Sequence, residues 1–340
     1  MKIRVLTSGI LATVQDLGRP QWRSNGVPLS GAADTLSHRL TNFLVGNEGS
    51  AATLEIAGGG FLANVEKPGW MAVCGAGGQF FVDKKEIGNG RLVFAPKGSE
   101  LEIRANPKGN FTYLATPGGW DVSEVLGSRS ICLSAGFGGF EGRGLRKEDV
   151  LSAADSSDNL KSSNELREGK VWVSKWFVNS PTFRKLSTFG KFDNVIRALP
   201  GSEFHWWGET QQQRFFNTPF IVSKQRDRMG VRLETVSGDS TFGKLDSMLS
   251  TAVAPGTVQV PPDGQPIALL ADAQTTGGYP RIAQVVAVDI PRLAQIPTGK
   301  IIQFQQVALE EAEELFFGQE NLLQKIRLSL QYRWLEKMMQ

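Results

Sequence analysis

Short apolar or alternating runs, separated by turn residues, recur along the whole chain. In the first half, glycine and proline bound runs rich in branched and aromatic side chains: KIRVLTS, ATLEIAG, WMAVCG, QFFVD, RLVFAP, ELEIRA and NFTYLAT. The pattern resumes later with VWVSKWFVN, NVIRALPG, PFIVSKQ, VRLETVSG, TVQVPP, PIALLA, AQVVAVDI and IIQFQQV. Runs of this length with turns between them predict antiparallel sheets or barrels.

Two segments have helical periodicity instead. In residues 30–46, SGAADTLSHRLTNFLVG, four apolar residues share one helical face, and we expect Ser30 to cap this helix and Gly46 to end it. From about residue 308 onward, five apolar residues between Leu315 and Trp334 keep to one face. This pattern predicts a C-terminal helix that packs on its own domain or faces a partner.

A polar segment divides the two β-rich halves. Residues 152–170, SAADSSDNLKSSNELREGK, lack aromatic residues and are rich in Ser, Asn, Asp and Glu. Such a segment buries little apolar area and is typical of an exposed linker. We therefore expect two domains, residues 1–165 and 166–340.

Composition narrows the function classes. The chain has 340 residues, with 37 basic and 34 acidic side chains mixed along it, so its formal charge of +3 does not indicate nucleic-acid binding. No apolar run is long enough to span a bilayer, and the first residues do not form a signal peptide, so we expect a cytoplasmic protein that does not enter the membrane. The two cysteines have no CxxC spacing, and the two histidines are too few for most zinc sites, so no metal centre is expected.

Several familiar catalytic motifs are incomplete. GDSTFGKL, residues 238–245, resembles a phosphate-binding loop but has Leu245 where that loop needs Ser or Thr to hold magnesium. GAGGQ, residues 75–79, lacks the third glycine of a dinucleotide fingerprint, and no GxSxG elbow is present. Nucleotide binding through a phosphate loop and serine catalysis are therefore not expected of this chain.

Dense polar clusters remain as candidate sites. They lie in TVQDLGRPQW, GVPLSGAAD, LGSRS, SKQRDRMGVRLE and VQVPPDGQPIALLADAQTTGGYP. Arginine and amide groups beside glycine turns can bind a carboxylate, a phosphate or a urea-like group through paired hydrogen bonds. The same residues can instead tie turns together.

Taken in order, these clusters resemble a known family. The runs TVQDLGRPQW, GVPLSGAADTLSHRLTNFLVGN, LGSRSICLSAGFGGFEGRGLRKEDVL, VSKQRDRMGVRLE and PGTVQVPPDGQPIALLADAQTTGGYPRIAQVVAVDI are similar to those of the biotin-dependent carboxyltransferase and allophanate hydrolase subunit 2 family. The resemblance covers nearly the whole chain. It implies a mainly β fold with a few helices, namely two tandem cyclophilin-like β-barrel domains plus a C-terminal helix.

The resemblance also implies an activity and partners. We expect one component of an ATP-dependent 5-oxoprolinase complex, which cleaves 5-oxoproline to L-glutamate and also contains an A subunit together with a KipI-like B subunit. ATP is expected at the level of the complex rather than on this chain alone. Two alternatives stay open: a biotin-dependent carboxyltransferase component acting on urea or a related amide, and a non-enzymatic protein that binds a KipI-like kinase inhibitor.

The family resemblance also suggests site residues. It implies that Asp272, Gln274 and Tyr279 line a pocket, and we assign catalytic roles to these three residues. The residues expected to bind substrate are Thr275, Arg228, Gln265, Asp263, Arg129, Asp16 and Arg19. Within the last polar cluster, we expect DAQTTGGYP to form the ligand site and PPDGQP to form a turn.

Overall fold

The computed structural model describes residues 1–154, 169–178, 194–236, 242 and 245–338 of the chain. It divides into two compact units. Unit 1 comprises Met1–Gly18, Ser30–Pro181 and Asn321–Gln340, and unit 2 comprises Arg19–Leu29 and Thr182–Glu320. The expected domain boundary near residue 165 and most of GDSTFGKL lie outside the described residues.

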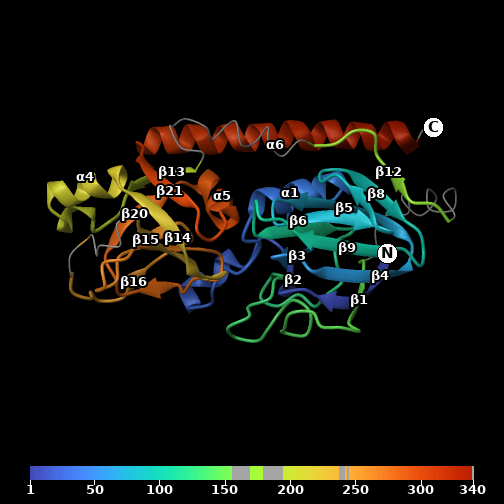
Figure 1. The fold of residues 1–340 in the computed structure, drawn as a ribbon, viewed down its shortest axis with the longest axis horizontal. Helices are drawn as coiled ribbons and strands as arrows, with labels where there is room; N and C mark the ends of the chain where they lie inside the picture. Colours follow the sequence, from blue (N-terminus) through green and yellow to red (C-terminus); the bar gives the residue numbers. More distant parts are fainter. Residues whose placement is uncertain (155–168, 179–193, 237–241, 243–244, 339–340) are drawn as a thin grey trace. The chain divides into compact units, whose positions relative to one another are not determined.

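The strands of unit 1 form two six-stranded sheets (Figure 1). One has the order β11-β1-β4-β9-β6-β7 and the other the order β12-β8-β5-β10-β3-β2. Their bounds are β1 Lys2–Ser8, β2 Leu11–Gln15, β3 Thr53–Ala57, β4 Phe61–Lys67, β5 Gly69–Gly75, β6 Gly78–Val82, β7 Lys85–Ile87, β8 Leu92–Ala95, β9 Glu100–Ala105, β10 Phe111–Ala115, β11 Val150–Ser152 and β12 Trp172–Val173. The seven runs predicted in the first half are all found as strands, because each alternates or fills its buried positions with apolar side chains.

The core of unit 1 contains side chains from both sheets. Val5 and Val65 of the first sheet and Ile56, Val73 and Val93 of the second belong to one buried cluster. Full burial of such a side chain contributes roughly 1.5–3 kcal/mol. The two sheets therefore hold each other in place through one shared core.

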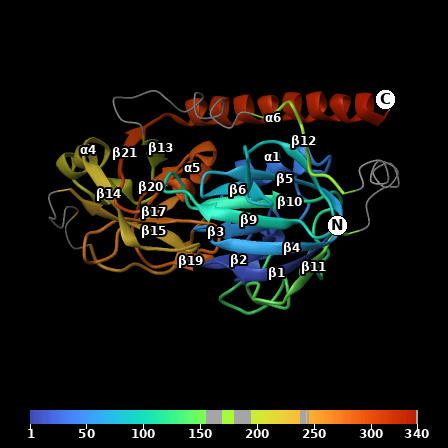
Figure 2. The same ribbon diagram turned by 45° about the vertical axis from the view of Figure 1, so that its right-hand side comes forward.

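Helix α1, Thr35–Leu44, covers the second sheet, packing on β5, β10 and β3 (Figure 2). Its cap is Asp34 rather than the expected Ser30: the Asp34 carboxylate accepts a hydrogen bond from the Ser37 amide at 2.9 Å. The Asp34 amide in turn donates to the Tyr113 hydroxyl, which donates to Glu55 at 2.6 Å. These buried contacts fix the start of the helix to the sheet, which no local propensity could indicate.

The strands of unit 2 close into a seven-stranded barrel with the order β13-β20-β17-β18-β15-β14-β21, beside the small pair β16-β19. Their bounds are β13 Val195–Pro200, β14 Pro219–Arg226, β15 Gly230–Thr235, β16 Thr251–Ala252, β17 Thr257–Gln259, β18 Ile267–Leu269, β19 Thr276–Gly277, β20 Arg281–Val285 and β21 Ile301–Gln306. Among the described residues, the helices that lie entirely in this unit are η1 Pro20–Asn25, η3 Phe204–Trp206, α4 Glu209–Asn217, η4 Ala287–Asp289 and α5 Ile290–Gln295. The predicted mainly β fold with a barrel and a C-terminal helix is confirmed, although among the described strands the closed barrel is that of unit 2, and those of unit 1 form two open sheets.

Four phenylalanines anchor α4 to the barrel. Phe215 of α4 stacks on Phe304 of β21 with ring centroids 4.8 Å apart, and it also meets the rings of Phe220 and Phe242. All four are fully buried. The apolar pattern did not predict α4, because ETQQQRFFN has only two aromatic residues, Phe215 and Phe216, on its buried side.

Two of the predicted strand runs are wrong in part. In AQVVAVDI the strand β20 ends at Val285, and the chain then turns through η4 into α5, with Pro291 in the first turn of that helix. The buried Asp289 accepts bonds from the Arg197 guanidinium at 2.7 and 2.9 Å, and this tertiary contact overrides the strand propensity of the run. In VWVSKWFVN only Trp172–Val173 is a strand among the described residues.

The C-terminal helix α6, Leu309–Met338, begins one residue from the predicted start (Figure 1). It is 30 residues long, and by the division of the chain it begins in unit 2 and ends in unit 1. Within the described residues, no helix combines the length and the apolar character needed to cross a membrane.

Candidate functional site in the barrel unit

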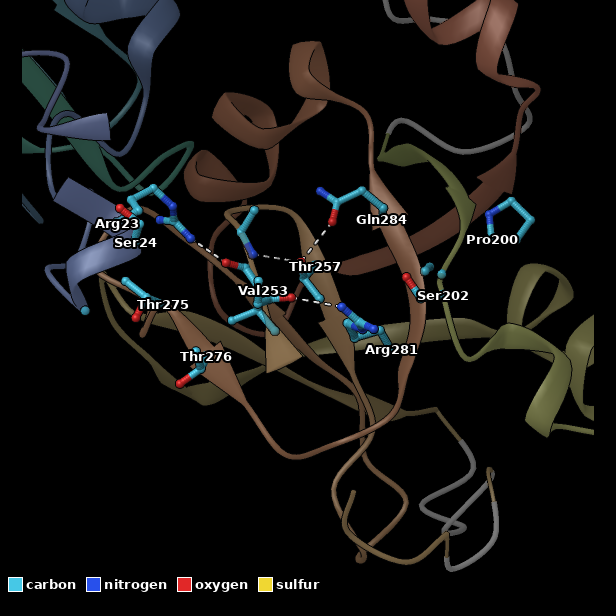
Figure 3. Close-up of a pocket in the computed structure, with 15 residues that line it drawn as sticks. Arg23, Ser24, Pro200, Ser202, Val253, Thr257, Thr275, Thr276, Arg281 and Gln284 are labelled. Atoms are coloured by element: carbon cyan, nitrogen blue, oxygen red, sulfur yellow. Dashed lines mark hydrogen bonds between the residues drawn. The ribbon is translucent and has the colours of Figure 1, made fainter. Parts of the chain in front are cut away.

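A cavity of about 760 Å³ lies in unit 2. It is bounded by the segment before β17, by β19 and β20, by the loop after β13 and by η1 (Figure 3). Its lining residues are Arg23, Ser24, Gly26, Pro200, Gly201, Ser202, Ala252, Val253, Ala254, Thr257, Thr275, Thr276, Arg281, Ala283 and Gln284. This volume is typical of small-molecule sites, and the lining mixes hydroxyl, amide and guanidinium groups.

One wall of the cavity is held by hydrogen bonds between its own residues. The Thr257 hydroxyl donates to Gln284 Oε1 at 2.9 Å and accepts from the Ala254 amide at 3.1 Å. Gln284 Nε2 donates to the Pro255 carbonyl at 3.0 Å. Because the polar groups of Thr257 and Gln284 already form hydrogen bonds within the protein, we assign both residues a structural role in this wall.

Arg281 lines the cavity with its charge already compensated. Its Nε and Nη2 donate to the Glu203 carboxylate at 2.6 and 2.5 Å, and its Nη1 donates to the Ala252 carbonyl at 2.9 Å. Hydrogen bonds from Arg281 lower the pKa of Glu203, and the pKa of Arg281 is raised correspondingly. Arg281 therefore braces β20 against β16 and contributes little net charge to the cavity.

Among the described residues that line the cavity, Arg23 is a cation without a carboxylate partner. Its Nη2 donates to the Val253 carbonyl (Figure 3), and its Nη1 is buried without a hydrogen-bond partner among the described residues. Burial lowers the pKa of Arg23, and no nearby carboxylate among the described residues opposes that shift. Arginine nonetheless stays charged, so the cavity contains a fixed guanidinium suited to an anion.

Thr275 and Thr276 supply hydroxyl groups below Arg23 and Ser24 in the view of Figure 3. The Thr275 carbonyl accepts from the Val253 amide at 3.0 Å, which joins this loop to the segment that Arg23 binds. No side-chain hydrogen bond of either threonine is found among the described residues, so both hydroxyls are available to a ligand.

Of the residues predicted to form a site, only Thr275 lines this cavity. Asp272 forms a buried ion pair with Arg228, with Nε–Oδ2 and Nη2–Oδ1 distances of 2.8 and 2.9 Å. The Asp272 amide also donates to the Arg228 carbonyl at 2.9 Å. This ion pair joins the start of the DAQTTGGYP loop to the turn between β14 and β15.

A buried glutamine joins the two ends of the same loop. Gln259 Oε1 accepts from Gln274 at 3.4 Å, and Gln259 Nε2 donates to the Tyr279 carbonyl at 3.2 Å. A Cβ on Gly277 would lie 2.5 Å from Gln259 Nε2, so glycine is needed there for the amide to fit. The Tyr279 side chain itself is exposed.

Asp263 and Gln265 form a turn tied to β15. The Asp263 carboxylate accepts from the Gln265 amide at 3.1 Å, and Gly264 between them has a positive φ of 76°. Arg232 contacts both side chains, pairing with Asp263 and donating to Gln265 Oε1 at 2.9 Å. These groups satisfy one another on the surface.

Asp16 and Arg129 meet in unit 1, whereas Arg19 is assigned to unit 2 and is fully buried. The Asp16 carboxylate accepts from the Gly18 and Arg129 amides at 2.7 and 2.6 Å, and from the Ser128 and Ser130 hydroxyls at 2.7 and 2.5 Å. The Arg129 side chain lies instead near Glu124, at 3.6 Å. Asp16 thus ties the 128–130 loop to the end of β2.

The predicted site residues do not include Arg23, Arg281, Glu203 or Gln259. Arg281 directly follows the last residue of DAQTTGGYP, and Arg23 directly follows the last residue of TVQDLGRPQW. Both could have been found by extending these polar clusters by one residue. Among the described residues, no cluster of three or more His, Cys, Asp or Glu side chains could hold a metal ion.

The family model for the carboxyltransferase domain, subdomain A and B, matches residues 25–306. The chain belongs to this family. It is 38% identical to the C subunit of 5-oxoprolinase from Escherichia coli (strain K12), covering 91% of this chain and 93% of the relative. It is 34% identical to the C subunit of 5-oxoprolinase from Haemophilus influenzae, covering 93% and 94%.

The chain is also similar to part of a larger protein of known structure. The crystal structure of the K. lactis urea amidolyase matches with a TM-score of 0.80 and 26% identity over 96% of this chain. This chain spans only 20% of that solved protein. The match therefore includes residues of both the barrel unit and the two-sheet unit.

Proposed function

We propose that this chain is the C subunit of a 5-oxoprolinase complex that uses ATP to cleave 5-oxoproline to L-glutamate. The observation that carries this proposal is the identity of 38% and 34%, over more than nine-tenths of each chain, with relatives named as the C subunit of that enzyme. Because the relatives are named as one subunit of an enzyme, we expect this chain to assemble with further subunits. These are an A subunit and a KipI-like B subunit. Because ATP is consumed by the complex, we expect it to act in the cytoplasm.

The barrel cavity supports binding of this substrate class. 5-Oxoproline is a small cyclic amide that carries one carboxylate. In the proposed arrangement, the Arg23 guanidinium binds the carboxylate, and the Thr275 and Thr276 hydroxyls hydrogen-bond the amide. Such directed donors polarise an amide carbonyl before a nucleophile attacks it.

The other residues of the DAQTTGGYP loop receive a positioning role in this proposal. Asp272 fixes the loop through Arg228, and Gln274 joins Tyr279 through Gln259. Both contacts hold Thr275 and Thr276 beside the cavity. Loss of either contact is expected to weaken substrate binding by moving these hydroxyl groups.

Reconstitution tests the proposed activity. The full chain is coexpressed with the A and B subunits of the same organism, and ATP-dependent glutamate release from 5-oxoproline is measured. A stable assembly of all three chains without turnover would remove the proposal. Turnover that needs this chain would support it.

Substitution of Arg23 tests the site separately. In an active complex, Arg23→Gln is expected to raise KM for 5-oxoproline roughly 10- to 100-fold, the effect of losing a hydrogen bond to a charged group. Arg23→Lys should retain part of the affinity. Arg214→Gln, which changes an exposed arginine of α4, is the matched control. Normal KM in the Arg23→Gln complex would reject this cavity while leaving the activity proposal intact.

A second function is favoured by the likeness to the urea amidolyase structure, with its TM-score of 0.80. In that case the chain transfers a carboxyl group from carboxybiotin to urea or a related amide. Consumption of carboxybiotin only in the presence of urea would identify this activity. Tight binding of a KipI-like protein without either turnover would instead indicate the non-enzymatic alternative.

A further inference from the structure

The barrel cavity is lined by two arginines, Arg23 and Arg281, and by no aspartate or glutamate among the described residues (Figure 3). Arg23 Nη1 is buried without a hydrogen-bond partner in this part of the chain. Arg281 instead pairs with Glu203, which directly follows the lining residue Ser202. Because the charges of Arg281 and Glu203 cancel, the wall presents the single positive charge of Arg23.

The Glu203–Arg281 pair engages both oxygens of the carboxylate. Glu203 Oε2 accepts from the Arg281 backbone amide at 3.0 Å and from Arg281 Nε at 2.6 Å, and Oε1 accepts from Nη2 at 2.5 Å. The side chains of Glu203 and Arg281 are only 8% and 18% exposed. Two-pronged bonds between charged groups are among the strongest hydrogen bonds in proteins. Both side chains are therefore committed to each other rather than to a ligand.

A glycine allows Glu203 to reach Arg281. The loop after β13 passes so close to β20 that a Cβ on Gly201 would overlap the Arg281 carbonyl oxygen and lie 2.8 Å from the Ala283 nitrogen. The Gly201 amide donates to the Ile282 carbonyl at 3.0 Å, which joins the two segments. A larger residue at position 201 would displace the loop and, with it, the Glu203 carboxylate. The fold thus places a carboxylate against one arginine of the cavity.

The substrate and the product of the proposed reaction distribute their charges differently. 5-Oxoproline has one carboxylate and a neutral ring amide. Hydrolysis breaks the ring C–N bond and adds one water, whose oxygen completes a second carboxylate while its two hydrogens make the ring nitrogen an ammonium. A wall with one available cation and no available carboxylate suits the substrate. It leaves the second carboxylate and the ammonium of the product without partners, which disfavours their burial.

We propose that the Glu203–Arg281 pair determines specificity, because it neutralises Arg281 and so makes the cavity select a monocarboxylate cyclic amide over the dicarboxylate amino acid formed from it. This inference rests on the proposed function. Without the Glu203 charge, two guanidinium groups would line the wall and could each bind a carboxylate. The product would then stay in the cavity and inhibit the next turnover.

A purely structural role of the same pair makes a different prediction. If Glu203 only braced the loop after β13 against β20, its loss would loosen the cavity wall. Affinity for every ligand would then fall by a similar factor. The ratio of two dissociation constants, one for a monocarboxylate and one for a dicarboxylate, separates the two roles.

Calorimetric titration of the assembled complex without ATP measures this ratio. The probes are 5-oxoproline and glutarate, a dicarboxylate of the same chain length as the product but without the ammonium. The wild-type complex should bind 5-oxoproline more tightly than glutarate. In Glu203→Gln, affinity for glutarate relative to 5-oxoproline should rise roughly 10- to 100-fold, the effect of one added hydrogen bond between charged groups. L-Glutamate should correspondingly become a stronger inhibitor of turnover.

Three further variants control for charge and folding. Glu203→Asp keeps the negative charge and should keep the wild-type preference. Glu209→Gln removes an exposed carboxylate of α4 that does not line the cavity, and it should leave the ratio unchanged. Ser202→Lys adds a second cation at an exposed lining position without altering the pair, so it should shift the ratio toward glutarate even if Glu203→Gln fails to fold. Thermal unfolding of each complex reports on folding.

The outcomes separate this inference from the proposed function. An unchanged ratio in a folded Glu203→Gln complex, or in Ser202→Lys, would overturn the specificity role while 5-oxoproline binding by the wild type upheld the site. A wild-type complex that binds no 5-oxoproline would reject the site and this inference together. A shift toward glutarate in both variants, with the wild-type ratio in Glu203→Asp, would support the proposal.

Discussion

Arg228 and Asp272 form a two-pronged ion pair whose side chains are only 5% and 9% exposed. Breaking a buried pair leaves the remaining charge without compensation, which costs about 3–5 kcal/mol. We therefore expect Asp272→Ala to lower the free energy of unfolding by this amount, measured by denaturant titration.

A second ion pair in the same unit supplies the control. Asp263 pairs with Arg232, but its side chain is 48% exposed, so Asp263→Ala should cost less than about 1 kcal/mol. If Asp272→Ala were as mild as this control and yet abolished turnover of the complex, Asp272 would act directly on the substrate. Its proposed positioning role would then be wrong.

The pattern of apolar positions predicted most strands, because alternate side chains of a strand point to the same face of the sheet and that face is buried. KIRVLTS is β1 over the same seven residues, with Ile3 and Val5 at its buried positions. By contrast, the strand expected in AQVVAVDI ends at Val285, and η4 and α5 follow, where the partner of Asp289 is Arg197, 92 residues away. Local propensity cannot register such a contact.

The candidate site was predictable only in part for a similar reason. Thr275 was singled out as a ligand residue and does line the cavity, because it follows the buried strand that the pattern identified. Arg23 reaches the same cavity because residues 19–29 belong to unit 2 although the chain on both sides of them belongs to unit 1. No periodicity or spacing in the sequence indicates this exchange.

Asp16 is expected to be a structural residue rather than a substrate ligand. Its carboxylate accepts four hydrogen bonds in a buried position, so a ligand would have to displace groups that already bind it. Asp16→Asn converts an acceptor into a donor facing these same groups, and we expect a loss on the order of 3 kcal/mol of unfolding free energy. Asp121→Asn, at an exposed position of unit 1, should change stability by less than about 0.5 kcal/mol. An Asp16→Asn chain of normal stability that no longer binds substrate would contradict this assignment.

His38 makes the stability of the protein depend on pH. The ring lies on the buried face of α1 and is fully buried, with Nδ1 2.8 Å from the Thr53 hydroxyl, and burial lowers its pKa to about 4 against an ordinary value near 6.5. Between these two values the unfolded chain binds a proton that the folded chain does not, so the free energy of unfolding falls as pH is lowered through this window. The full difference corresponds to about 3 kcal/mol, and above pH 6.5 this contribution to stability should be constant.

A substitution isolates this contribution from that of the carboxylates, which also titrate near the lower end of the window. Between pH 6.5 and pH 4, the free energy of unfolding of His38→Gln should fall by about 3 kcal/mol less than that of wild type. The free energy of unfolding is measured for both chains at a series of pH values. His205→Gln, which changes the exposed histidine beside α4, should retain the wild-type slope. Parallel curves for wild type and His38→Gln would mean that His38 is protonated as readily in the folded protein as in the unfolded chain, contrary to its burial.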